Sequence, residues 1–179
     1  MGIVAKSTGG GKDFIPAPSG AHAAICCDVV DLGVLKVSYG GKEKSQHKVR
    51  IVWQIAEVMQ DNKPFICQKR YTLSLHEKAA LRKDLESWRG IPFEDAEVEN
   101  GFDLEKLISA PCLLNVMQVK KGADTYANVT TIMRLPKSME APKVRDYVRF
   151  KDRKPESQNQ QVPEDSDGNY FPSDDDVPF

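Results

Sequence analysis

Apolar and polar residues alternate with a period of two along residues 48–55, Lys-Val-Arg-Ile-Val-Trp-Gln-Ile. This period is typical of a strand with one buried face. A similar stretch at 21–31 predicts an earlier strand, which continues as an extended piece at 34–39 after a kink at Gly33. The polar, basic segment 40–46 between them is predicted as a loop. The folded part of the chain is therefore predicted to begin with two β-strands.

A turn at 61–64 leads into a third predicted strand at 65–73. The period then changes, because Leu81, Leu85 and Trp88 recur at the i, i+4 and i+7 spacing of a helix with one apolar stripe. A capping box formed by Ser74 and Glu77 predicts the start of this helix, and Gly90 and Pro92 predict its end.

A short second helix is predicted at 103–108, followed by strands at 111–119 and 125–134. Three strands, a helix and two strands is the element order of a mainly β, five-stranded oligonucleotide-binding (OB) Greek-key barrel with its helix between strands 3 and 4. Other small β-rich folds with an inserted helix share this order and remain alternatives. The barrel is predicted for residues 21–136.

Composition changes on either side of this body. Residues 1–20 are rich in Gly, Ser and Pro and are predicted as a flexible arm, and 137–154 as a basic, mostly irregular linker. Residues 155–179 contain seven carboxylates and no Lys or Arg, and are predicted as a disordered acidic tail. The tail carries −7 of an overall charge of −1, so residues 1–154 carry +6. A basic body indicates a polyanionic partner, although a merely solubilising tail is the alternative.

The faces of the strands select candidate DNA-binding residues. In the second strand, Val49, Ile51, Trp53 and Ile55 are predicted as core, and Lys48, Arg50, Val52 and Gln54 as an exposed basic face. In the third strand, the face that Lys69 shares with Tyr71 is ambiguous, and in the last strand Tyr126 is predicted to be exposed opposite Val129, Thr131 and Met133. The loops at 40–46 and 120–124 add lysines. The candidates are Lys42, Lys44, Lys48, Arg50, Gln54, Lys69, Arg70, Tyr71, Lys120, Lys121, Tyr126 and Tyr39.

Such a surface suits unpaired nucleotides, because cations neutralise phosphates and aromatic rings stack on bases. For each lysine on its own, an ordinary solvated surface charge is an equally good interpretation. Trp53 is more consistent with core than with stacking.

No pattern for catalysis, a cofactor or a metal is evident. The glycine-rich run Ser7–Lys12 lacks the strand, the helix and the hydroxyl residue of a phosphate-binding loop. The three histidines lie apart from one another, and the four cysteines show no paired spacing, which indicates reduced, partly buried thiols. The carboxylates of 94–99 fall in a stretch predicted to be irregular, so an enzyme, for example a nuclease, is the least favoured function.

The chain ends in Asp174, Asp175, Asp176, Val177, Pro178 and Phe179. A terminal aromatic ring beside carboxylates is suited to a partner's apolar pocket with a basic rim. This tip resembles the Asp-Asp-Asp-Ile-Pro-Phe ending of bacterial single-stranded-DNA-binding proteins, with Val177 in place of Ile. Together with the basic body, it makes the chain similar to phage-type single-stranded-DNA-binding proteins.

The resemblance implies a non-enzymatic protein that coats single-stranded DNA and recruits replication, recombination and repair proteins through its tip. It implies the cytoplasm of a bacterial host, in agreement with the lack of a secretory signal or an apolar run of the roughly 18 residues that span a membrane. Monomer and homodimer both remain open. The alternative is a protein–protein adaptor whose tail is the functional element and whose body does not bind DNA.

Overall fold

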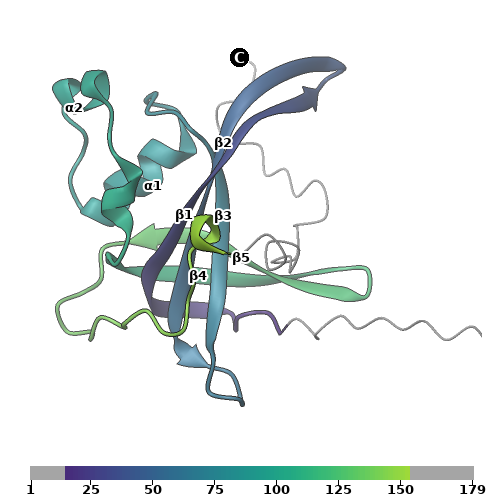
Figure 1. Ribbon diagram of the computed structural model, residues 1–179, viewed down its shortest axis with the longest axis vertical. Coiled ribbons are helices and arrows are strands. Elements are labelled where there is room, and N and C mark those ends of the chain that lie inside the picture. Colours follow the sequence, from purple (N-terminus) through teal and green to yellow (C-terminus); the bar gives the residue numbers. More distant parts are fainter. Residues whose placement is uncertain (1–14, 154–179) are drawn as a thin grey trace, which may run out of the picture.

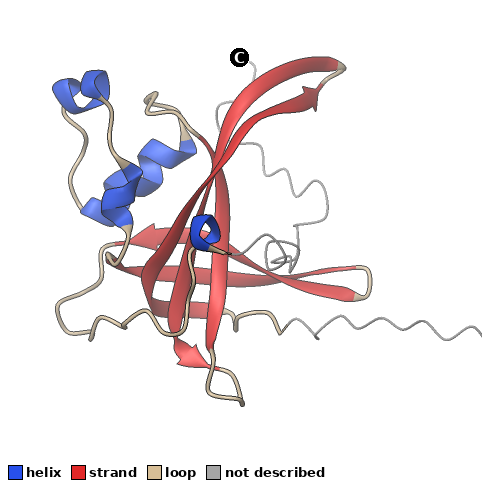
Figure 2. Ribbon diagram, in the orientation of Figure 1, coloured by secondary structure: helices blue, strands red, loops and turns tan. Residues whose placement is uncertain are grey.

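Five antiparallel strands form a single sheet in the computed structural model, which describes residues 15–153 (Figures 1 and 2). The strands are β1 (Gly20–Tyr39), β2 (Lys42–Val58), β3 (Pro64–Thr72), β4 (Pro111–Lys121) and β5 (Asp124–Met133). Their order across the sheet is β3-β2-β1-β4-β5. The prediction of a mainly β body with five strands is confirmed. The sheet is not closed, since β3 and β5 approach each other without a hydrogen-bonded ladder in the described part of the chain.

The long central strand β1 joins the two halves of the sheet. It pairs with β2 along most of its length and with β4 through Gly20–Ile25. Its register against β2 shifts twice, between Cys26 and Asp28 and between Asp31 and Gly33. Because a bulge kinks a strand without ending it, the predicted pieces at 21–31 and 34–39 are one bent strand.

Two hairpins project from the sheet in different directions as long arms (Figure 1). The β1–β2 arm comprises residues 33–48, and the β4–β5 arm comprises residues 117–128. The first arm turns at Gly40 and Gly41, whose φ angles of 55° and 78° are both positive. Such a pair makes a two-residue hairpin turn, so pairing resumes at once. The predicted loop at 40–46 is therefore wrong beyond Gly41.

The alternation of β5 is interrupted close to its end. The register against β4 shifts between Asn115 and Val116, which leaves one extra residue on β5. Val129 lies in the core before the shift and Ile132 lies in the core after it. Thr131 and Met133 are consequently exposed, and the prediction that they share the face of Val129 is wrong.

The helix between β3 and β4 is α1 (Ala80–Arg89), and its predicted apolar stripe of Leu81, Leu85 and Trp88 is buried. The helix ends at Gly90, which has a φ of 75° as predicted for a C-cap glycine. The predicted capping box at Ser74 is wrong. Ser74 Oγ instead accepts a hydrogen bond from the His76 amide in a turn that precedes the helix.

Two short helical segments follow α1. Helix α2 (Asp95–Asn100) begins with a capping box between Glu94 and Glu97, so the prediction of an irregular stretch there is wrong. The predicted second helix at 103–108 is present as the 3₁₀ helix η1 (Leu104–Leu107).

Helix α1 packs across the gap between the edge strands β3 and β5. Trp88 stacks at a tilt on Trp53, with ring centroids 6.0 Å apart, and its indole nitrogen donates to Pro111 O at 2.9 Å. Ser87 Oγ donates to Ile132 O on β5. The helix thus covers the open side of the core, and Trp53, with no exposed surface, is core as predicted.

Residues 134–153 are mostly irregular and end in the 3₁₀ helix η2 (Phe150–Asp152). This yellow-green turn contacts β1 on the sheet (Figure 1). Within residues 15–153 no helix is long and apolar enough to cross a membrane.

Candidate nucleic-acid interface

The pairing register gathers seven of the predicted DNA-binding residues, Gln54 among them, on one face of the sheet. Side chains of directly paired residues point to the same side of a sheet. Tyr39 pairs with Lys42, and Arg50 pairs with Arg70. Since β2 runs without a bulge from Lys42 to Gln54, its even-numbered residues stay on this side. We call the six cationic or aromatic members the basic face: Tyr39, Lys42, Lys44, Lys48, Arg50 and Arg70.

Side-chain exposure decreases along β2 from the arm toward the sheet. Lys42 and Lys44 are exposed on β2, whereas the sequence placed them in a loop. Tyr39 is 50% exposed beside Lys42. Lys48 is half-buried, and its Nζ donates to Thr72 Oγ1 at 2.8 Å. Arg70 is exposed on β3. The exposed cations therefore lie on the arm at Lys42 and Lys44 and on β3 at Arg70, with the half-buried Lys48 and the buried Arg50 between them.

The predicted exposure of the remaining outward residues of β2 is wrong. Arg50, Val52 and Gln54 are buried on the face that the sequence predicted to be open. At Gln54 a segment from the C-terminal part of the described chain covers the sheet. The Gln54 amide donates to Arg145 O at 2.7 Å, and its Oε1 accepts from the Arg145 amide at 2.8 Å.

This covering segment, residues 143–153, is called the strap. Its main anchor is Asp28, a carboxylate that is only 1% exposed. Asp28 accepts hydrogen bonds from the Tyr147 hydroxyl at 3.1 Å, from Arg149 Nε at 3.1 Å and from the Phe150 amide at 2.7 Å. A buried carboxylate with three donors is well satisfied. The segment predicted as part of a basic linker is thus packed against the sheet.

Arg149 connects the strap to η1 as well. Its two terminal nitrogens donate to the Glu105 carboxylate at 2.8 Å each, which is the bidentate geometry of a strong ion pair. The Glu105 partner raises the pKa of Arg149, and the arginine lowers the pKa of Glu105. Burial also raises the pKa of Tyr147. All three groups therefore keep the charge states that hold the strap.

Sequence reasoning missed Asp28 and the strap. The available signal was an aspartate in the middle of the apolar run Ala23–Val30, because a carboxylate in such a run requires partners. Nothing in the pattern showed that Tyr147 and Arg149, about 120 residues later, supply them.

Lys69 and Tyr71 lie on the opposite side of the sheet, toward α1. Tyr71 is 3% exposed, and both its hydroxyl and Lys69 Nζ donate to Asp84 Oδ2 at 2.7 Å. Burial raises the pKa of Tyr71. The ambiguous face of β3 is therefore the core face, and the ring of Tyr71 is not accessible for stacking on a base.

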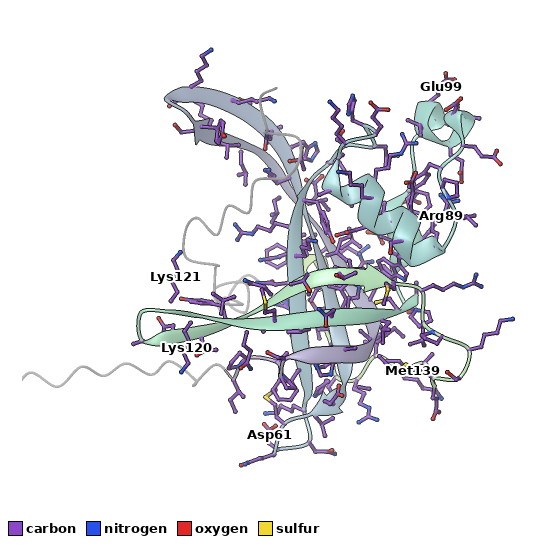
Figure 3. The ribbon with its side chains drawn as sticks, turned by 180° about the vertical axis from the view of Figure 1, so that it is seen from behind. Asp61, Arg89, Glu99, Lys120, Lys121 and Met139 are labelled. Atoms are coloured by element: carbon purple, nitrogen blue, oxygen red, sulfur yellow. The ribbon has the colours of Figure 1, made fainter. Side chains whose placement is uncertain are left out.

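The β4–β5 arm presents its candidates on two sides. Val119 pairs with Tyr126 and Lys121 pairs with Asp124, so Lys121 and Tyr126 share a face, while Lys120 lies on the other. Figure 3 shows Lys120 and Lys121 pointing to opposite sides near the tip of this arm. Tyr126 is half-buried, although the sequence predicted it to be exposed.

The other groups considered for chemistry lie apart from these surfaces or are inert. The four cysteines are buried free thiols, and burial raises the pKa of Cys26 and Cys67 to about 12. His47 Nε2 lies 2.6 Å from the Asp31 carboxylate, and Glu97 pairs with Arg89. Among residues 15–153, no group of three or more histidine, cysteine or acidic side chains is arranged to hold a metal ion.

The predicted partner-binding tip, Asp174–Phe179, lies outside the described residues. So do most of the predicted flexible arm and the acidic tail. The proposals concerning them rest on the sequence.

Comparison with known proteins gives no match from which to assign a function, so the assignment rests on these surfaces. No protein-family model matches the chain, and a search of curated proteins found none with significant similarity.

Proposed function

We propose that this protein binds single-stranded DNA through the basic face and recruits replication, recombination and repair proteins through its C-terminal tip. The observation that carries the proposal is the register of β2, which sets Lys42, Lys44 and Lys48 in one row. The outward residues of β2 from Lys42 to Gln54 include no carboxylate. A row of cations with this spacing can neutralise consecutive phosphates of a flexible strand.

The fold supports this proposal as an OB-type barrel left open between β3 and β5. β1 is paired with both β2 and β4, and a helix stands between β3 and β4, as in that architecture. The β1–β2 and β4–β5 hairpins correspond to the two connections with which OB folds contact oligonucleotides. Tyr39 on one arm and Tyr126 on the other provide rings for stacking, worth about 1–3 kcal/mol per base.

The tip supports the second half of the proposal. Three aspartates, an apolar Val-Pro pair and a C-terminal Phe combine charge and an aromatic anchor in six residues. A partner with an apolar pocket and a basic rim recognises such a peptide. The resemblance of the tip and the basic body to phage-type single-stranded-DNA-binding proteins supports the cytoplasm of a bacterial host as the proposed location.

The test is a titration of labelled poly-dT and of a duplex at several salt concentrations. We expect tighter binding of the single strand and a binding constant that falls as salt rises, because bound phosphates release counterions. Equal affinity for both forms would contradict the proposal, and no affinity for either would favour the adaptor function.

A charge-reversal pair localises the site. Lys42→Glu with Lys44→Glu is expected to weaken poly-dT binding about tenfold or more at low salt and to reduce the salt slope by about 1.4, for two lost phosphate contacts. The matched control is Lys36→Glu, which lies in the same arm but pairs with Ser45 on its other side. Because Lys36 lies on the side of the arm away from the basic face, we expect this change to alter poly-dT affinity by less than about threefold.

A further inference from the structure

The strap lies on the outward side of the sheet, which is also the side of the basic face. The outward residues of β1 and β2 beneath or beside it are buried, as shown by Ile25 at 7% and Gln54 at 3% exposed. The outward side of β3 is more open, since Ile66 is half-buried and Arg70 is exposed. The cover therefore ends before the edge strand, and the outward surface from Arg70 toward the β1–β2 arm stays accessible.

The attachment of the strap is a built clasp. The Asp28 carboxylate accepts three hydrogen bonds from the strap, and Glu105 holds Arg149 from the other side. These contacts consume Arg149, the cation that anchors the strap. The two carboxylates and one arginine of the clasp carry a net charge of −1, and the number of bonds that they make indicates a fixed position of the strap on the sheet.

The remaining cations of the strap face solvent. Lys143, Arg145 and Lys151 are exposed; Arg145 uses only its backbone to bind Gln54, and Lys151 Nζ lies 3.9 Å from the Glu105 carboxylate. Arg153 lies over the Tyr147 ring, 5.3 Å from its centroid. Residues 143–153 contain five basic and two acidic side chains. A segment of net positive charge is thus held over Asp28 and Gln54, on the same side of the sheet as the basic face.

We propose that the strap is the second wall of the DNA-binding groove, with the strand's phosphates passing between the basic face and Arg145 and Lys151. Asp28 is the positioning residue that holds this wall. The inference rests on the proposed function and adds to it a binding element that comes from outside the five strands. It assigns a role to a segment whose sequence alone indicates a linker.

The test is the full-length double variant Arg145→Gln, Lys151→Gln. The slope of log K against log salt for poly-dT is expected to decrease by about 1.4, and the affinity at low salt to fall about tenfold. The Gln54 contacts are made by the backbone of Arg145, so the fold is retained. The matched control, Lys78→Gln with Lys83→Gln, removes the same charge on the α1 side and is expected to leave the slope unchanged.

The outcomes separate this inference from the proposed function. If the wild-type protein binds poly-dT and responds to the Lys42 and Lys44 changes, while the strap variant keeps the full slope, only the second wall is refuted. Tighter binding by the strap variant would show that the strap is a cover and would also overturn the inference. If the wild-type protein does not bind poly-dT, the proposed function itself fails.

A second variant examines Asp28. Asp28→Asn keeps the side-chain shape but removes the charge that holds Arg149. We expect faster amide hydrogen exchange at residues 145–150 and a reduced salt slope for poly-dT, with the circular dichroism of the sheet unchanged. Faster exchange with an unaltered slope would refute the positioning role of Asp28. If this variant does not fold, the strap double variant decides the question.

Discussion

At the scale of single residues, the side of the sheet on which a side chain lies separates binding candidates from structural groups. Lys69 and Arg70 are neighbours of the same charge type, yet Lys69 bonds Asp84 beneath α1 and Arg70 lies exposed beside Arg50. Tyr71 and Tyr39 differ in the same way, since Tyr71 is 3% exposed and Tyr39 is 50% exposed.

The two tyrosines permit a direct comparison. Tyr71→Phe removes one hydrogen bond to Asp84 and is expected to lower the free energy of unfolding by about 1 kcal/mol, because a typical bond contributes that amount. It should leave poly-dT affinity unchanged. Tyr39→Ala is expected to change stability by less than about 0.5 kcal/mol, as surface substitutions do, and to weaken poly-dT binding. Urea denaturation and titration measure both quantities, and a loss of affinity in Tyr71→Phe would contradict the placement of its ring.

At the scale of elements, the clasp between η1 and the strap depends on charge. Glu105 faces Arg149 and Lys151, and the buried Asp28 carboxylate lies on the other side of the arginine. The hydrogen bonds of Arg149 hold the pKa of Glu105 below its ordinary value of 4.5. The bond between η1 and the strap is thus tied to the ionised form of this carboxyl group.

This dependence predicts how acid affects the strap. A group with a lowered folded pKa contributes stability that is fully present above its unfolded pKa and is lost as the pH falls through the folded value. We therefore expect slow amide exchange at residues 145–150, after correction for intrinsic rates, from pH 7 to about 4.5, and faster exchange below it. Glu105→Gln should show the faster exchange already at pH 7. A wild-type strap that loosened between pH 7 and 5 would contradict this assignment.

At the scale of the whole molecule, charge is divided between a basic body and an acidic C-terminal region. Residues 155–179 carry −7 and residues 1–154 carry +6. The acidic region begins two residues after the end of the strap, and the strap is held on the same side of the sheet as the basic face. A tethered polyanion competes with DNA at a high effective concentration, and salt screens that competition.

Deletion of residues 155–179 is therefore expected to strengthen poly-dT binding at low salt, with a difference that shrinks as salt rises, and to abolish recruitment of partner enzymes. Phe179→Ala is the matched control, because it keeps all seven carboxylates and should affect recruitment alone. Fluorescence titration and pull-down measure the two effects. Weaker DNA binding by the truncated protein at low salt would refute the competition.

Local periodicity was sufficient for most of the elements. The core face of β2 and the stripe of α1 follow from spacings of two and 3.6 residues, the end of α1 follows from the glycine at position 90, and each is confirmed. The errors arose where pairing overrides local composition. A polar stretch after Gly41 became part of β2 because β1 supplied a partner strand, and the extra residue in β5 near Thr130 reversed its faces.

Sequence alone thus established most of the elements, the core face of β2 and the separation of charge along the chain, because each depends on residues close together or on simple composition. Whether the sheet closes, and which part of its outward face is covered, depended on contacts across the whole chain. Asp28 and Arg149 are 121 positions apart, and no local pattern couples two residues at that distance. Only the folded arrangement brings them together, because a carboxylate buried in the sheet needs donors, and the strap is the segment that provides them.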